Sequence, residues 1–224
     1  MNLDSVSEEI RRRFDLKMAA REKALPASRR AIRSSANAIR AIHRGEAEKA
    51  SALMEEAGQA IGEAVEAVRD HPDVGHAGFI QDAQKEYAEA RITEALVADR
   101  ELPGPDELGV ELAPYLNGMA EAVGEARRRI LDLLRKGEVG RGESLLQAMD
   151  DIYFVLASMD YPDAITGNLR RSTDVARSIM EKTRGDLSLS LVNRDLRDAL
   201  DRHAREVLHG SSGAPDAGTE PETP

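Results

Sequence analysis

Apolar residues recur every three to four positions along most of the chain, which is the spacing of one face of an α-helix. Alanine, leucine, glutamate and arginine dominate these stretches, and no alternating strand pattern stands out. Turn sequences rich in glycine, proline and aspartate separate them. We therefore expect an all-α fold of about seven helices, with Pro26 as a kink or break in the first. The expected helices cover residues 6–44, 47–69, 75–100, 112–136, 142–159, 164–182 and 186–209.

The chain is expected to form one helical domain over residues 1–209. Its 224 residues, 41% of them hydrophobic, suffice for one sizeable core. The remaining segment, 210–224, reads GSSGAPDAGTEPETP and contains too few apolar residues to order itself. We expect this tail to be disordered.

The charge and residue content narrow the function classes. A net charge of -10 argues against simple electrostatic adhesion to nucleic acid or anionic membrane, but it leaves room for a local basic face. The absence of cysteine excludes disulfides and thiolate metal sites. No apolar leader and no run of about 18 apolar residues is present, so we expect a soluble, cytoplasmic protein. Aromatic residues make up only 3%, so nucleic-acid binding would depend mainly on arginine.

Two glutamates of the expected helix 75–100 lie on its apolar side. On a helical wheel, four apolar residues fall within roughly 60° of Glu86: Phe79, Ala83, Ala90 and Val97. Glu89 lies about 60° to the other side. Two carboxylates three residues apart can bind one hard cation or share a proton. The alternative is that these glutamates pair with arginines of a neighbouring helix.

A polar stripe follows the expected helix 112–136. The apolar face consists of Tyr115, Leu116, Met119, Val123, Ala126, Ile130, Leu133 and Leu134. Glu121 and Glu125 point roughly the opposite way, in line with Asn117, Arg128 and Asp132. Periodicity alone predicts a solvated face. Gly118 and Gly124 flank Glu121, and small residues there would let another helix or a ligand come close.

An arginine stripe follows the expected helix 6–44. It consists of Arg29, Arg30, Arg33, Arg40 and Arg44, and it is roughly 22 Å long at 1.5 Å per residue. That length suits several phosphates in a row. The alternative is a solvated face paired with acidic helices. We interpret the adjacent His43 as a helix C-terminal residue rather than a ligand.

Sequence signatures of common catalytic sites are missing, including Walker A, H-E-x-x-H and G-x-S-x-G. Five scattered histidines and no cysteine do not favour zinc. Any metal would be held by oxygen ligands, which makes Mg²⁺ or Mn²⁺ the candidate.

Four blocks together resemble the translin and translin-associated factor X superfamily, most of all its archaeal members. They are SRRAIRSSANAIRAIHRG, QKEYAEA, YLNGMAEAVGEARRRILDLL and DYPDAITGNLRRSTDVARSIMEKTRGDLSLSL. They occur in the family's order and spacing, and the resemblance extends to about residue 209. It implies an all-α protomer that assembles into a hollow, octamer-like homo-oligomer enclosing single-stranded RNA or DNA.

The resemblance also implies a site. The factor X branch is a metal-dependent endoribonuclease, and Glu86 and Glu89 match both glutamates of its E-Y-x-E-A pattern. Glu121 stands where the branch has an aspartate, so its carboxylate is displaced by one methylene. Glu125 matches a further acid one turn later. The family's basic segments map onto residues 29–44 only approximately.

Our hypothesis places Mg²⁺ or Mn²⁺ between the two helices, with Glu86 and Glu121 as ligands. Glu89 is a ligand or the general base, Glu125 completes the acidic set, and Arg128 stabilises charge on the phosphate. Two other interpretations stay open. One is a translin-like binding protein without turnover, and the other is a helical scaffold without RNA affinity.

Overall fold

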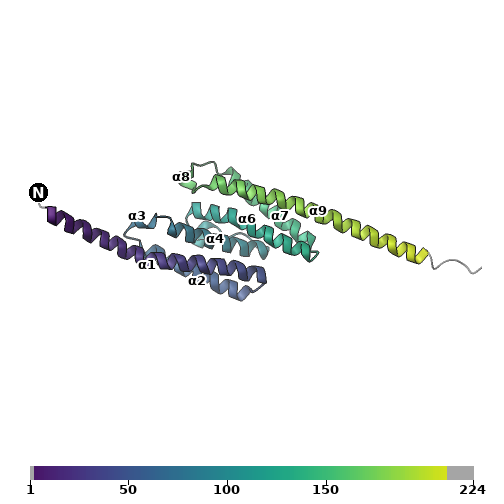
Figure 1. The fold of residues 1–224 in the computed structure, drawn as a ribbon, viewed down its shortest axis with the longest axis horizontal. Coiled ribbons are helices and arrows are strands. Elements are labelled where there is room, and N and C mark those ends of the chain that lie inside the picture. Colours follow the sequence, from purple (N-terminus) through teal and green to yellow (C-terminus); the bar gives the residue numbers. More distant parts are fainter. Residues whose placement is uncertain (1–2, 211–224) are drawn as a thin grey trace, which may run out of the picture.

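The structure is a computed structural model that describes residues 3–210, and it confirms the all-α prediction. These residues contain six long helices, three single helical turns and no strand (Figure 1). The long helices are α1 (Leu3–Arg44), α2 (Ala47–Ala67), α4 (Phe79–Val97), α6 (Leu112–Arg135), α7 (Val139–Ser158) and α9 (Leu169–Gly210). The single turns are α3 (Pro72–Gly75), α5 (Pro105–Leu108) and α8 (Asp163–Thr166).

The long helices pack in three layers. The pair α1 and α2 forms one side, α4 and α6 lie in the middle, and α7 and α9 cover the other side (Figure 1). Helix α4 contacts α1, α2 and α6, and α6 contacts α7 and α9 as well. The two middle helices are therefore covered on both sides by other helices.

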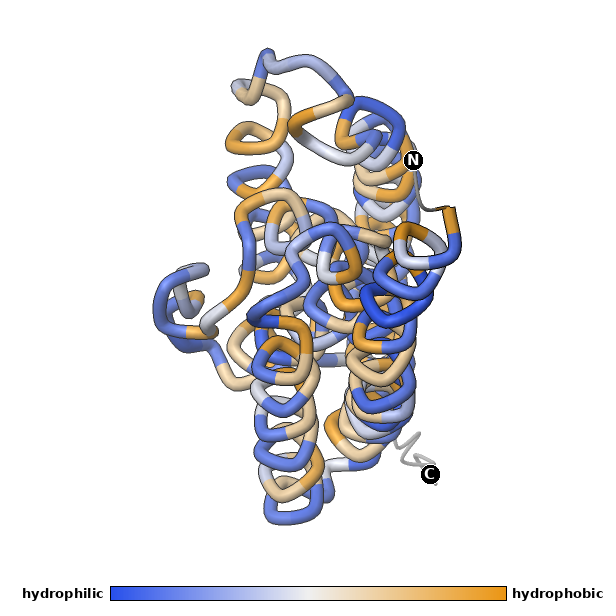
Figure 2. The backbone as a smooth tube through the Cα atoms, turned by 90° about the vertical axis from the view of Figure 1, so that its left-hand side faces the viewer, coloured by the Kyte–Doolittle hydropathy of each residue, from blue (hydrophilic) through white to orange (hydrophobic). Residues whose placement is uncertain are grey.

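The core combines many alanines with a few large apolar residues. Ile92, Ile130, Leu133 and Met149 are almost completely buried, and each contributes roughly 1.5–3 kcal/mol of burial free energy. Hydrophobic and hydrophilic residues alternate along the helices (Figure 2), as the spacing of apolar residues predicts. Alanines supply much of the remaining core and let the helices approach closely.

The chain stays helical at Pro26, where a kink or break was predicted, and at Gly185, where a break was predicted. Helix α1 continues through Pro26, where the neighbouring Ala24 and Ala27 are buried in a cluster with residues of α2 and α4. Helix α9 continues through Gly185, so the predicted helices 164–182 and 186–209 are one element from Leu169 onward. Burial against other helices offsets the missing hydrogen bond at the proline and the flexibility of the glycine.

Contacts of α6 hold α9 together on both sides of Gly185. Arg127 donates hydrogen bonds to Thr183 Oγ1 at 3.0 Å and to Asp186 Oδ2 at 2.7 Å. Leu187 is buried, with 3% of its surface exposed. The local signal for a break is therefore overridden by tertiary contacts, and the last two predicted helices form one long helix.

The ends of the two longest helices extend beyond the bundle in opposite directions (Figure 1). Both extensions expose apolar residues at helical spacing, namely Leu3, Val6, Ile10, Phe14, Leu189, Val192, Leu196 and Leu200. No helix within residues 3–210 is long and apolar enough to cross a membrane. Of the predicted tail, residues 211–224 lie outside the described residues, and Gly210 ends α9.

Candidate metal centre

Helices α4 and α6 touch at Gly118. A Cβ atom at this position would lie 2.6 Å from the Lys85 carbonyl oxygen and 3.0 Å from the Glu89 nitrogen. Backbone atoms cannot yield at such distances, so only glycine permits this approach. At Gly124 a Cβ would meet only Ile179 Cδ1, at 3.9 Å, which is an ordinary contact. The predicted close approach is thus confirmed at Gly118 and not needed at Gly124.

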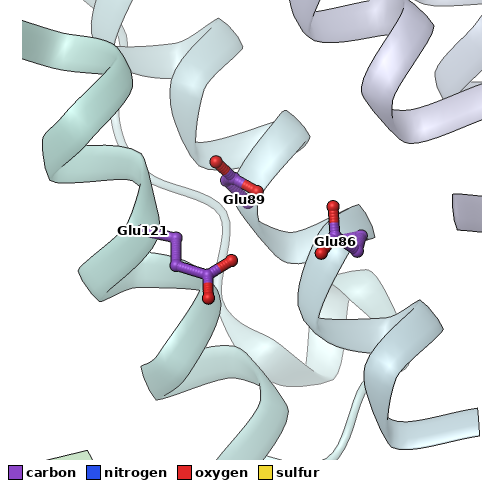
Figure 3. Close-up of side chains that lie close together, drawn as sticks. All are labelled: Glu86, Glu89 and Glu121. Carbon is purple, nitrogen blue, oxygen red and sulfur yellow. The ribbon is translucent and has the colours of Figure 1, made fainter. Parts of the chain in front are cut away.

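Three predicted site residues meet across this contact. Glu86 and Glu89 come from α4 and Glu121 comes from α6, and each directs its carboxylate toward the space between the helices (Figure 3). One oxygen of each lies within 4.8 Å of the others. Ligands on opposite sides of a magnesium ion are about 4.2 Å apart at bonds of about 2.1 Å. The three carboxylates, which we call the carboxylate cluster, therefore lie close enough for small side-chain rotations to bring them onto one divalent cation.

Glu89 is the most buried member of the cluster, with 9% of its surface exposed. Among residues 3–210, no ion pair or hydrogen bond of its side chain is found. Burial, followed by the charges of Glu121, Glu86 and Glu125, raises its pKa to about 8. Burial also raises the pKa of Glu86, although Lys85 counteracts it. Without a cation, Glu89 therefore holds a proton below about pH 8, because its surroundings disfavour a third negative charge in the cluster.

Lys85 supplies the partial compensation. Its Nζ lies 2.7 Å from Glu121 Oε1 and 3.5 Å from Glu86 Oε1, so one ammonium group bridges α4 and α6. Burial works against its charge, but the hydrogen bond and charge of Glu121 raise its pKa above the ordinary value. Nothing in the sequence pattern indicated this contact, because Lys85 and Glu121 are far apart in the chain.

Glu121 fits the solvated face only in part. Its side chain is 41% exposed, but its carboxylate faces α4. The nearby Asn117 of the same stripe is buried, and its amide donates to the Thr166 carbonyl at 2.8 Å. Helix α6 packs on more than one side, so periodicity around its main apolar face could not separate solvent from the second packed side.

Glu125 lies outside the group of three and is held by His43 of α1. His43 Nε2 contacts Glu125 Oε2, and the histidine side chain is only 3% exposed. This hydrogen bond holds the Glu125 pKa below its ordinary value. Arg128 NH1 is 3.8 Å from the same carboxylate and is exposed, so the predicted Arg128 lies beside Glu125.

His43 was underestimated from the sequence. It does belong to the last turn of α1, but it reaches α6 instead of solvent. Its position four residues after the buried Ile39 places both side chains on one side of the helix. That spacing was the available signal. For the alternative interpretation, in which Glu86 and Glu89 pair with arginines of a neighbouring helix, no such ion pair is found among residues 3–210. Glu94 of α4 does lie 3.0 Å from Arg100, but that arginine follows α4 itself.

The arginine stripe lies on the exposed side of α1. Arg30 pairs with Glu63 of α2, and Arg44 is 4.0 Å from Glu46. For Arg29, Arg33 and Arg40, no ion pair is found within the described part of the chain. Arg30 and His43 lie roughly 140° apart around the helix, with these three arginines between them. The unpaired part of the stripe therefore faces outward and ends one turn from His43.

Known proteins resemble this chain over most of its length. No family model matches. The uncharacterized protein MJ0175 of Methanocaldococcus jannaschii is 30% identical over 188 residues, 83% of each chain. The crystal structure of AfC3PO is 32% identical with a TM-score of 0.76, covering 87% of this chain and 99% of that one.

A structure of AfC3PO with duplex RNA gives the same identity and TM-score. The crystal structure of apo-NeC3PO matches with a TM-score of 0.71 over 84% of this chain and 97% of its own, and its 23% identity supports the fold alone. AfC3PO and NeC3PO are translin/C3PO-type proteins. Together with the four sequence blocks and the matching all-α protomer, these likenesses show that the chain belongs to the translin superfamily.

Proposed function

We propose that this protein is an RNA-binding, Mg²⁺- or Mn²⁺-dependent endoribonuclease of the translin-associated factor X type. The observation that carries the proposal is the carboxylate cluster. Three glutamates from two helices converge within 4.8 Å, and the most buried of them has no counter-charge of its own among residues 3–210. Burying a carboxylate such as Glu89 costs several kcal/mol unless a cation or a proton compensates it, and a divalent cation could contact all three carboxylates at once.

Each acidic residue of the cluster has its own role in the proposed reaction. Glu86 and Glu121 hold the cation from opposite helices, and Glu89 serves as a third ligand or as the proton acceptor. A bound divalent cation supplies Lewis acidity to a phosphodiester and favours ionised water at neutral pH. Without a cation, burial and the neighbouring carboxylates raise the Glu89 pKa to about 8, so a bound cation would replace a proton on this group. The exposed Arg128 contacts the phosphate.

RNA binding is supported by two observations. AfC3PO, which shares 32% identity, has been seen with duplex RNA. In this chain, Arg29, Arg33 and Arg40 form an exposed basic face that ends near His43 and Glu125. We propose single-stranded RNA or DNA as the ligand, with duplex RNA as the comparison that any binding assay must include.

We further propose a hollow, octamer-like homo-oligomer. The apolar extensions of α1 and α9 support it, because residues such as Ile10, Phe14 and Leu196 are 48%, 64% and 56% exposed in the protomer. Other copies would cover them. Acidic residues would then lie outside for solubility, while the arginine face lines the cavity and meets the RNA.

Cleavage of a labelled single-stranded RNA in Mn²⁺ or Mg²⁺ tests the nuclease proposal. Wild-type cleavage should disappear with EDTA, and Glu86→Ala and Glu89→Gln should each lower it by a factor of about 100 or more. Glu94→Gln is the matched control, because Glu94 is on the same helix but pairs with Arg100 outside the cluster. Equal losses in Glu94→Gln and Glu89→Gln would show that helix α4 was disturbed in general.

The second candidate is a translin-like RNA-binding protein without turnover. The observation that favours it is the Lys85 ammonium, which already neutralises part of the cluster. RNA binding by the wild type without cleavage in either metal would establish this candidate. Absence of any RNA retention on a filter would leave only a helical scaffold.

A further inference from the structure

We propose that the Lys85 ammonium competes with the divalent cation for the carboxylate cluster. Once the cation has displaced it, the lysine side chain rotates and its ammonium binds the substrate phosphate. This inference rests on the proposed function. It adds a residue outside the predicted acidic set, and it assigns that residue two successive partners.

The first step of the argument is where the ammonium lies. Lys85 Nζ is 2.7 Å from Glu121 Oε1 and 3.5 Å from Glu86 Oε1. These are the two carboxylates that would ligate the cation from opposite helices. The ammonium therefore already bridges two of the carboxylates that a divalent cation would need.

The second step is that both cations cannot hold Glu121 in this way. A metal bond of about 2.1 Å to a Glu121 oxygen would place a second positive charge within a few ångströms of the ammonium. Unit charges that close repel strongly where solvent is partly excluded, and the Lys85 side chain is only 26% exposed. Binding of the divalent cation should therefore release the ammonium.

The third step concerns how it can leave. The backbone at Lys85 is fixed, because its carbonyl oxygen packs against Gly118 so closely that a Cβ there would lie at 2.6 Å. The movement must then be a rotation of the side chain, whose four-carbon stem is flexible. Because the Lys85 side chain is partly exposed, it can rotate toward solvent and not into the core.

The fourth step identifies the second partner. A phosphodiester that approaches the cluster enters from the solvent side and brings negative charge to the opening where the released ammonium lies. Lysine binds phosphate as a compact point charge and needs no fixed geometry. Because Lys85 is next to Glu86 in the sequence, its side chain keeps the ammonium within reach of the reacting phosphate.

Calorimetric titration of Mn²⁺ into the RNA-free, full-length protein tests the competition without using activity. Lys85→Gln should bind Mn²⁺ about fivefold more tightly than wild type, because the competing charge is gone. Lys85→Arg keeps the charge and should stay near wild type. Lys49→Gln is the matched control, because its lysine makes a 2.8 Å pair with Glu46 far from the cluster.

Single-turnover RNA cleavage at saturating Mn²⁺ tests the transfer. Lys85→Gln should cleave about tenfold more slowly despite its tighter metal binding. This combination of opposite changes is the signature of the proposal, since a variant that merely unfolds would lose both metal binding and cleavage. Lys85→Arg should recover part of the rate. Thermal melts of all variants confirm that they are folded.

The outcomes separate the inference from the function. Wild-type protein that binds no Mn²⁺ would overturn the metal centre, and the inference with it. Mn²⁺ binding that is equal or weaker in Lys85→Gln would overturn the competition and leave the nuclease proposal intact. Tighter Mn²⁺ binding with an unchanged cleavage rate would overturn the transfer to phosphate.

Discussion

The carboxylate cluster and the arginine face of α1 both collect like charges, but they do so in different surroundings. In the cluster, Glu89 is 9% exposed and has no charged partner of its own among residues 3–210. On α1, Arg29, Arg33 and Arg40 are exposed, and water screens their repulsion. Placing like charges near one another costs little free energy in water. Between packed helices it costs more, so the cluster is the stronger evidence for a site.

The two regions meet at His43. This residue belongs to α1, one turn beyond Arg40, and it contacts Glu125 of α6 beside the cluster. RNA bound along the arginine face would therefore extend toward the carboxylate cluster. The following variants test whether the contrast between the two regions is real, beginning with the largest expected effect on stability.

Gly118→Ala should destabilise the fold by about 3 kcal/mol, because the new methyl group would overlap the backbone of α4. Gly124→Ala is the matched control and should stabilise by about 0.5–1 kcal/mol, since its Cβ has room and alanine favours helix. Urea unfolding measures both. Equal effects at the two glycines would mean that the close approach at Gly118 does not set the geometry of the cluster.

Stability in EDTA should fall as pH rises, because of Glu89. Its folded pKa of about 8 lies above the ordinary value of 4.5, so its contribution is fully present below pH 4.5 and is lost as pH rises through 8. We expect the wild type to lose about 2 kcal/mol between pH 5.5 and pH 7.5 relative to Glu89→Gln. Thermal or urea unfolding across this range measures it. Parallel curves for the two proteins would contradict the buried, proton-binding carboxyl.

The arginine face supplies the control for this pH effect. Arg33→Gln changes an exposed charge, so its stability should follow the wild-type pH curve with an offset within about 0.5 kcal/mol. Adding Mn²⁺ should flatten the wild-type curve and leave that of Glu89→Gln less changed, because a cation replaces the proton on Glu89.

His43→Ala should destabilise by about 1.5 kcal/mol, because it leaves the Glu125 carboxylate half-buried without its donor. His43→Gln keeps a donor and should recover part of the loss. The stabilities are compared by urea unfolding at pH 7. A loss that is the same in both variants would mean that packing of the imidazole ring matters, and not its bond to Glu125.

Arg33→Ala with Arg40→Ala should leave stability within about 0.5 kcal/mol. RNA binding should weaken, and its dependence on salt concentration should flatten by about one unit of slope for each phosphate that the protein no longer neutralises. Filter binding at several salt concentrations measures this. Arg12→Ala is a control on the same helix, because Arg12 pairs with Glu9 in the extension. An unchanged slope would remove the arginine face from RNA binding.

Local signals predicted much of the protomer. Helical periodicity predicted α1, α2, α4, α6 and α7 to within a few residues at each end, and the break before residue 112 falls where glycine and proline are dense. The same signals failed at Pro26 and Gly185, where buried contacts with other helices outweigh a local cost of a few kcal/mol. The predicted active role of the acids was not a matter of periodicity, since the resemblance to the family supplied it.

The sequence by itself determined the all-α class, the apolar face of each helix and the unusual position of Glu86 on such a face, because these follow from the spacing of residues along one helix. Only the tertiary structure decided which charges meet. Glu121 faces Glu86 and Glu89 because Gly118 lets α6 touch α4. Lys85 and His43 acquire their partners from a helix distant in sequence. Such contacts depend on how helices pack, and one-dimensional periodicity carries no information about that.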